Sequence, residues 1–324
     1  MRIWRPLGLA IAGVAVTLSL INASWIAPDP KGRLILVARR GVGPAIPPDA
    51  LAGGGCTATR IKQPAEDALY IENSLPSLYR AVKLGAGAIE VDVRRTRDGH
   101  AVLFRDPGLE CRTNGRGAVR DHDLASLKAL DIGFGYTADG GRTFPLRGRG
   151  VGGMATVEEA LREVPTTRLI FNLPAGDPAV ADGLVAAFGR AGGAIDGKYG
   201  FHGDPVAVAR LKRLAPTAWT FSVTSPGSCR DDYLRVGWTS FVPAGCRDTT
   251  LILPLDDQIA LWGWPNRFLA RMAGAGSTVM MVARHSGGAI TGLESVEQIE
   301  DVPRDFRGYL WIEDFLAVGR AVRR

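Results

Sequence analysis

Two acidic side chains in the stretch Ala88–Val93 have the type and spacing that could support chemistry. Glu90 and Asp92 stand two residues apart in an otherwise apolar run. On a β-strand this spacing points both carboxylates to the same face. A bare pair of buried carboxylates would be costly to desolvate, so a cation is expected nearby. That cation is either a divalent metal ion held by oxygen ligands or an arginine, and a purely structural salt-bridge site is the third interpretation.

The elements that must position these acids are short apolar runs alternating with helical patterns. Strands are expected at residues 33–38, 88–93, 101–104, 169–173, 218–222, 250–254, 278–282 and 308–312. Helices are expected over 72–84, 124–130, 178–191, 205–214 and 266–274, and one more begins at Thr156, with Glu159 completing a capping box. About eight strands with intervening helices predict an α/β fold, a (β/α)8 TIM barrel.

Active sites of such barrels lie at the C-terminal ends of the strands. The residues that this rule brings to one mouth are Arg39, Arg40, Glu90, Asp92, Arg105, Asn172, His202 and His285.

Composition limits the classes of partner. The chain has 324 residues, 46% of them apolar and 22% charged, as in an ordinary globular protein. The net charge is +6, to which Arg2 and Arg5 contribute two charges. No lysine-rich run or aromatic-interleaved basic patch is present, so nucleic acid is not an expected partner. A basic surface facing anionic lipid or phosphate is compatible with the charge.

Residues 1–27 have the pattern of a targeting segment. Arg2 and Arg5 precede an apolar run from Leu7 to Ile21. The run suits a signal peptide cleaved after Ala23, and it suits an uncleaved membrane anchor equally well. In both cases residues 28–324 are expected to form one exported domain, either periplasmic or anchored to the membrane and facing outward.

The four cysteines agree with export. None forms a Cys-x-x-Cys pair, so a zinc site is not expected. In an oxidising compartment we expect two disulfides. Three connectivities are open, and we favour the local pairings Cys56–Cys111 and Cys229–Cys246.

Several motifs, in the same order, resemble the glycerophosphodiester phosphodiesterase family between Leu34 and about Asp177. The matching stretches are Arg40-Gly41, Glu72-Asn73-Ser74, Glu90-Val91-Asp92, Asp98-Gly99, Asp106, Cys111–Gly115 and Leu130–Gly133. The resemblance implies a barrel of the phospholipase-C-like type that hydrolyses phosphodiesters of glycerophospholipid metabolism. Its partners would be a glycerophosphodiester or a phospholipid headgroup, with a membrane surface as a further possible partner.

The resemblance also implies roles for individual residues. A divalent ion, calcium or magnesium, would bind Glu90 and Asp92, with Asn172 as a weaker ligand. Arg40 and Glu72 would belong to the substrate-binding site. Two family histidines would exchange protons with the substrate, and a family arginine would hold its phosphate.

The sequence departs from the family at these catalytic positions. Arg39 and Arg105 stand where the family has histidines, and Asn172 and Pro174 stand where it has glutamate and lysine. Arginine stays protonated, so neither Arg39 nor Arg105 is expected to act as a general base. We therefore expect both arginines to pair with Glu90, Asp92 or Glu72 and to take the place of the metal.

Three interpretations of function stay open at this stage. The first is a phosphodiesterase with an altered acid–base set, in which His202 or His285 replaces the lost imidazoles. The second is a non-catalytic pseudoenzyme of the cell envelope that binds a phosphate or lipid headgroup. The third is a structural envelope protein. Dependence on a metal ion separates the first from the second.

Overall fold

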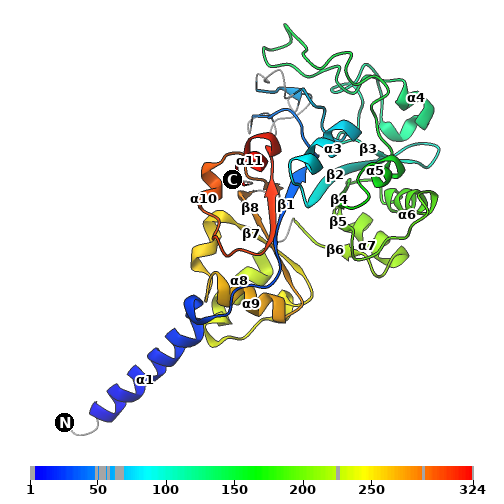
Figure 1. The fold of residues 1–324 in the computed structure, drawn as a ribbon. Helices are drawn as coiled ribbons and strands as arrows, with labels where there is room; N and C mark the ends of the chain where they lie inside the picture. The colour runs from blue at the N-terminus through cyan, green and yellow to red at the C-terminus, as the bar shows by residue number, and fades with distance from the viewer. Residues whose placement is uncertain are drawn as a thin grey trace. The chain divides into compact units, whose positions relative to one another are not determined.

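The computed structural model describes residues 4–47, 50, 56, 59–62, 69–223, 227–286 and 289–322 (Figure 1). The chain divides into two compact units. Unit 1 comprises Met1–Ile35, Val223–Thr291 and Glu297–Trp311, and unit 2 comprises Leu36–Ser222, Gly292–Val296 and Ile312–Arg324. The predicted division into residues 1–27 and 28–324 stays a prediction.

Unit 2 is built on a parallel sheet. Its strands are β1 (Leu34–Arg39), β2 (Ala88–Arg95), β4 (Arg168–Leu173), β5 (Gly200–Gly203) and β6 (Trp219–Thr220), paired in the order β6-β5-β4-β2-β1. β3 (Ala101–Leu103) pairs antiparallel with β2, because the turn at Asp98-Gly99 is too short for a parallel crossover. The predicted apolar runs of this unit therefore form strands, since each is long enough and apolar enough to be buried in a sheet.

Helices follow the strands of unit 2. They are α3 (Leu75–Lys83), α4 (Leu124–Lys128), α5 (Val157–Glu163), α6 (Val180–Arg190), α7 (Pro205–Leu214) and α11 (Phe315–Ala321), with the 3-10 turn η4 (Val119–Asp121). Ser74 caps α3, and the predicted capping box of Thr156 and Glu159 begins α5. These caps satisfy backbone N–H groups that a helix start leaves without partners. They also determine the residues at which α3 and α5 begin.

Unit 1 carries a second set of parallel strands. β7 (Thr250–Pro254), β8 (Thr278–Val282) and β11 (Gly308–Ile312) pair in that order, and Ile312 itself falls in unit 2. β9 (Arg284–Ser286) and β10 (Ala289–Thr291) form a separate antiparallel pair. The helices are α1 (Trp4–Asn22), α8 (Gly227–Val236), α9 (Asn266–Gly274) and α10 (Glu297–Glu300), with 3-10 turns η1 (Ser24–Ile26), η5 (Gly237–Thr239), η6 (Ala244–Cys246) and η7 (Leu255–Ala260).

Both favoured disulfides are present. Cys56 is bonded to Cys111 within unit 2, and Cys229 to Cys246 within unit 1. The local pairing predicted from the sequence is thus confirmed.

The predicted N-terminal apolar run is helix α1. Over the part of the chain that the structure describes, no helix meets the length and hydropathy required to cross a membrane.

Candidate active site at the strand ends of unit 2

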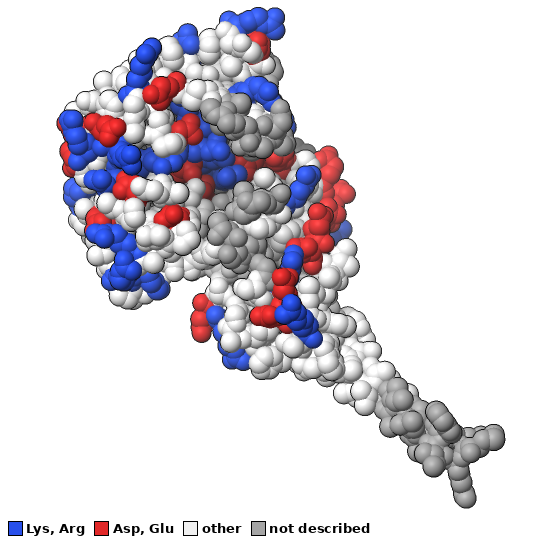
Figure 2. All heavy atoms as spheres, turned by 180° about the vertical axis from the view of Figure 1, so that it is seen from behind, with Lys and Arg blue, Asp and Glu red and all other residues white. Residues whose placement is uncertain are grey.

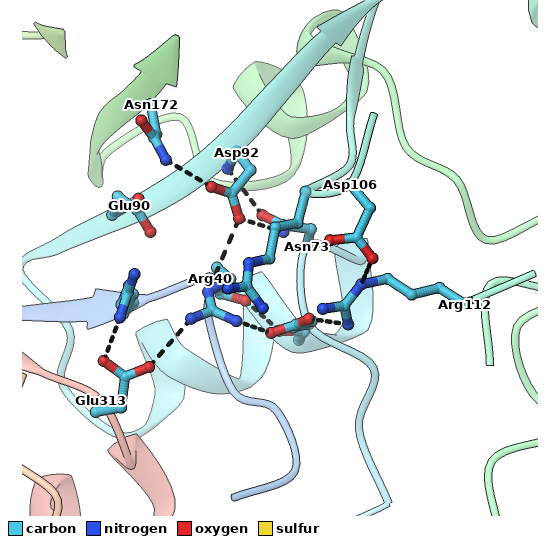
Figure 3. Close-up of polar contacts among 12 residues, drawn as sticks. Arg40, Asn73, Glu90, Asp92, Asp106, Arg112, Asn172 and Glu313 are labelled. Atoms are coloured by element: carbon cyan, nitrogen blue, oxygen red, sulfur yellow. Dashed lines mark hydrogen bonds and ion pairs between the residues drawn. The ribbon is translucent and has the colours of Figure 1, made fainter. Parts of the chain in front are cut away.

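The register of the sheet brings the predicted polar residues of unit 2 together. Arg39 lies opposite Glu90, and Asp92 lies opposite Asn172. Asn172 in turn lies opposite His202 on β5. Glu90 and Asp92 are both buried, as their spacing on β2 predicts, and Figure 3 shows both near Arg40 and Asn172.

His285 belongs to the other unit, where it lies on β9.

The carboxylate of Asp92 is held by two amides. The side-chain amino group of Asn172 donates to Asp92 Oδ1 at 2.8 Å, and that of Asn73 donates to Oδ2 at 3.1 Å (Figure 3). Burial alone would raise the pKa of Asp92, but the positive charges of Arg40 and Arg105 outweigh it, and the pKa is lowered. Asp92 is therefore a fixed anion at neutral pH.

Beside Asp92, a buried chain of ion pairs is centred on Glu72. Arg40 donates to one carboxylate oxygen of Glu72 and Arg112 to the other. The hydroxyl of Tyr136 also donates to Glu72, at 3.2 Å, and Arg112 Nε donates to Asp106 at 2.7 Å. Burial would raise the pKa of Glu72, yet Arg112 and Arg40 lower it to about 2. These ion pairs hold the guanidinium of Arg40 in place beside Glu72.

Arg39 has a partner that the sequence did not predict. Arg39 Nη1 donates to Glu313 Oε2 at 2.6 Å, and Arg40 Nη2 donates to Oε1 at 3.1 Å. The backbone N–H of Gly292 adds a third bond at 3.3 Å. The side-chain hydrogen bond of Arg39 is therefore made to Glu313, which directly follows β11, and not to the expected Glu90, Asp92 or Glu72. The charge of Arg39 still contributes to the lowered pKa of Asp92. Burial would raise the pKa of Glu313, and Arg39 and Arg40 lower it.

Arg105 is the second arginine that was expected at a family histidine position. It is partly buried, and its Nη1 has no hydrogen-bond partner among the described residues. Its pKa is lowered, first by burial and then by repulsion from Arg40. Its charge acts on Glu72 and Asp92 without a direct bond. Arg105 thus retains donor capacity that the protein's described side chains do not use.

His202 and Glu90 form the other close pair of the site. His202 Nε2 lies 3.5 Å from Glu90 Oε1, and both side chains are buried. The imidazole stacks on the ring of Phe221, with 5.3 Å between ring centroids. Glu90 Oε2 has no hydrogen-bond partner in the described part of the chain.

Two parallel-strand units with helices between the strands define an α/β protein, and unit 2 carries a cluster of carboxylates and guanidiniums at its strand ends. Comparisons with known proteins indicate which family this α/β protein resembles. Residues 64–174 match the glycerophosphoryl diester phosphodiesterase family model. This segment includes Glu72, Glu90, Asp92, Arg105 and Asn172.

Curated relatives match over the same part of the chain. A glycerophosphodiester phosphodiesterase of Caldanaerobacter subterraneus is 43% identical over 65 residues, which are 20% of this chain and 27% of that protein. Another from Bacillus subtilis is 42% identical over 62 residues, covering 19% of this chain and 21% of that protein. The chain therefore spans about a quarter of the length of the curated relatives it matches.

Solved structures match over almost the whole chain. The glycerophosphoryl diester phosphodiesterase domain of an uncharacterised Mycobacterium tuberculosis protein has a TM-score of 0.59 at 16% identity, covering 90% of this chain and 98% of that one. An Oleispira antarctica phosphodiesterase, solved in complex with the product sn-glycerol-3-phosphate, has a TM-score of 0.56 at 16% identity, covering 93% and 100%. The predicted TIM-barrel fold class is confirmed. Residues 64–174 of the chain thus resemble the glycerophosphodiester phosphodiesterase family, and the solved structures of that family share the fold of the chain.

Members of this family typically bind a divalent metal ion, and the donor set of this chain does not fit one as it is arranged. Among the described residues no group of three or more His, Cys, Asp and Glu side chains could hold a metal. Both oxygens of Asp92 already accept hydrogen bonds, and Asn172 presents its amino group, a donor, to the carboxylate. Arg40 Nε lies 3.8 Å from Asp92 Oδ2. Arg40 thus places a positive charge beside the carboxylate of Asp92.

Sequence reasoning did not single out several members of the site. They are Asn73, Asp106, Arg112, Tyr136 and Glu313. Asn73, Asp106 and Arg112 lie inside the quoted motifs, which was a usable signal. Glu313 had a weaker one, an acid immediately after the last predicted strand.

Proposed function

We propose that this chain recognises the phosphodiester group of a glycerophosphodiester at the strand ends of unit 2, through guanidinium groups. The observation that carries the proposal is the gathering of Arg39, Arg40 and Arg105 beside the buried carboxylates. Arg105 is central, because its Nη1 has no acceptor among the described residues. Guanidinium groups bind phosphate oxygens with paired, charge-assisted hydrogen bonds.

The contacts of Glu313 support the proposal, because its carboxylate is an anion of the protein itself that two of these arginines already bind. Its carboxylate accepts from both Arg39 and Arg40, the arrangement that a phosphate would also adopt. The cavity lined by these three residues and their neighbours measures about 30 Å³, room for a single water rather than a ligand. We infer that a bound phosphate displaces Glu313 from the arginines.

Turnover is proposed to be weak in comparison with family members that have histidines at these positions. Guanidinium groups do not exchange protons near neutral pH, and general acid–base catalysis contributes about 10²–10⁴-fold to a rate. The main proposal is therefore phosphodiester recognition without efficient hydrolysis.

Hydrolysis through a replaced acid–base group is the second candidate function. The 3.5 Å approach of His202 Nε2 to Glu90 favours it, because a carboxylate beside an imidazole can orient it for proton transfer. The burial of His202 opposes direct contact with a substrate.

An exported location is also proposed. Two disulfides support it, because such bonds persist in oxidising compartments.

Calorimetric titration with glycerophosphocholine and sn-glycerol-3-phosphate, in a chelator, tests the main proposal. We expect binding to the wild-type chain, at least tenfold tighter binding to Glu313→Gln, and weaker binding to Arg105→Met. Glu163→Gln, which changes an exposed acid of the same unit, serves as the matched control. No binding by folded wild-type protein would refute phosphate recognition.

Release of sn-glycerol-3-phosphate, assayed with calcium, magnesium or chelator, separates the two candidates. Turnover that His202→Gln abolishes, while binding persists, would establish the second candidate. Turnover that requires a metal ion would contradict the assignment of arginine as the cation of the site.

A further inference from the structure

Arg271 bonds the C-terminal end of α1 to the rest of unit 1. Arg271 Nη2 donates to the carbonyl of Ile21 at 2.8 Å, and Nη1 donates to Asn22 Oδ1 at 3.0 Å. The same guanidinium donates to Ser240 Oγ at 2.7 Å and to the Gly237 carbonyl at 3.1 Å. A positive charge at the C-terminal end of a helix also stabilises it. These bonds join α1 to η5 and to α9, and Figure 1 shows the C-terminal end of α1 near α8 and α9.

Large exposed aromatic side chains surround this junction. We call them the aromatic rim: Trp25 (81% exposed), Trp238 (42%), Phe241 (56%) and Trp262 (42%). Asn22 Nδ2 donates to the carbonyl of Trp238 at 2.8 Å, and Trp25 lies in η1, which packs on α9. The indole N–H of Trp262 is satisfied by the Leu234 carbonyl at 2.9 Å.

The segments 233–247 and 258–275, which carry the rim, contain Arg235, Arg247, Arg267 and Arg271, and aspartates flank them at positions 231, 232, 248, 256 and 257. Arg235 lies 3.6 Å from Asp232, so the positive charge relevant to the rim is that of Arg247, Arg267 and Arg271. Residues 6–27 contain no charged residue, and Figure 2 shows the described part of α1 without a charged side chain. A surface that combines exposed apolar groups with positive charge complements anionic phospholipid.

A groove at the same junction is lined by both apolar residues and arginines. Its volume is about 490 Å³, and its lining residues are Leu20, Ile21, Ser240, Arg267, Ala270 and Arg271. Arg267 Nε is buried and has no hydrogen-bond partner among the described residues. The groove therefore combines apolar walls with the partly buried side chain of Arg267, the combination that a lipid headgroup with its first acyl carbons requires.

We propose that α1, the aromatic rim and this groove form a surface that docks unit 1 on a bilayer containing anionic phospholipid. The rim side chains lie at headgroup level, where tryptophan is favoured at membrane interfaces. Arg267 contacts lipid phosphate, while Arg271 holds the end of α1 in place. The proposal is independent of the phosphate site in unit 2.

Quenching of tryptophan fluorescence by brominated lipids tests the position of the rim. The full chain is mixed with vesicles of phosphatidylcholine and phosphatidylglycerol that carry bromine near the headgroup. Because α1 by itself could hold the chain on vesicles, the decisive comparison is with Trp25→Phe/Trp238→Phe/Trp262→Phe, in which we expect most of the quenched signal to be lost. An unchanged quenched signal would overturn the proposal.

Flotation with the same vesicles tests affinity and charge. We expect Trp25→Ser/Trp238→Ser/Phe241→Ser to partition at least about tenfold less. The matched control, Val151→Ser/Val206→Ser, changes two equally exposed apolar residues of unit 2 and should partition as wild type. An equal loss in the control would overturn the proposal.

Arg267→Gln separates lipid phosphate from apolar insertion. We expect it to lose the preference for phosphatidylglycerol over phosphatidylcholine while still binding vesicles. A wild-type preference would contradict the role of the groove. Self-association of the chain through the rim, with no vesicle binding, would replace the bilayer with a second copy as the occupant.

Discussion

Replacing Glu72 by glutamine should destabilise the protein strongly, since this carboxylate is the common partner of two buried guanidiniums. Arg40 and Arg112 each donate to one of its oxygens, and the hydroxyl of Tyr136 adds a third bond. A neutral amide of the same size would leave both guanidiniums without their main counter-charge. Removing one partner from a buried ion pair costs about 3–5 kcal/mol.

The pKa of Glu72 leads to a similar magnitude. Its shift from 4.5 to about 2 corresponds to about 3 kcal/mol of stabilisation of the charged form. Urea unfolding, followed by tryptophan fluorescence, measures the difference between wild type and Glu72→Gln. Asp123→Asn is the control, because Asp123 and its partner Arg97 are exposed, and this change should leave the midpoint close to that of wild type. A loss below about 1 kcal/mol in Glu72→Gln would refute the reasoning.

The pH dependence of stability is a separate measurement of the same effect. The folded-state pKa of Glu72 lies below its unfolded value, so its contribution is fully present above about pH 4.5. As the pH falls from 4.5 toward 2, the unfolded state takes up the proton first, and the stabilisation is lost. The lowered pKa values of Asp92 and Glu313 act in the same direction. Glu72→Gln should show a shallower loss in this window than wild type, and an identical slope would contradict the assignment.

Two further changes test the packing and the covalent links. Gly135→Ala should destabilise the protein by at least about 3 kcal/mol, because the added Cβ would lie 1.8 Å from the carbonyl oxygen of Cys111. The control Gly189→Ala, where the Cβ meets open space, should stabilise the protein by up to about 1 kcal/mol. Equal melting temperatures of the two variants would count against the contact. Cys229→Ser/Cys246→Ser opens a disulfide between residues 17 apart and should lower the free energy of unfolding by about 3 kcal/mol, whereas an unchanged urea midpoint would show that this bond does not constrain the unfolded chain.

Local patterns in the sequence were sufficient for the elements and for part of the site. The apolar runs and helical periodicities predicted most strands and helices, because burial and periodicity are properties of neighbouring residues. The period of two along β2 predicted that Glu90 and Asp92 share a face. Thr156 and Glu159 predicted the start of α5, since a capping box lies within four residues. α8, α10, α11 and the β9–β10 hairpin were missed, because these segments are short or lack a clear apolar repeat.

The partners of the arginines were decided by the tertiary structure alone. Arg39 bonds to Glu313, 274 positions away, and nothing local distinguishes this acid from Glu90 or Asp92. Asn172 was expected as a metal ligand, yet the sheet register places it beside Asp92, where its amino group donates to the carboxylate. Long charged side chains have many rotamers and reach several candidates, and the strength of each ion pair depends on distance and burial. The sequence by itself thus predicted several of the charged groups at the strand ends, among them Arg40, Glu90 and Asp92, whereas the fold added Glu313 and determined which of these groups neutralise one another.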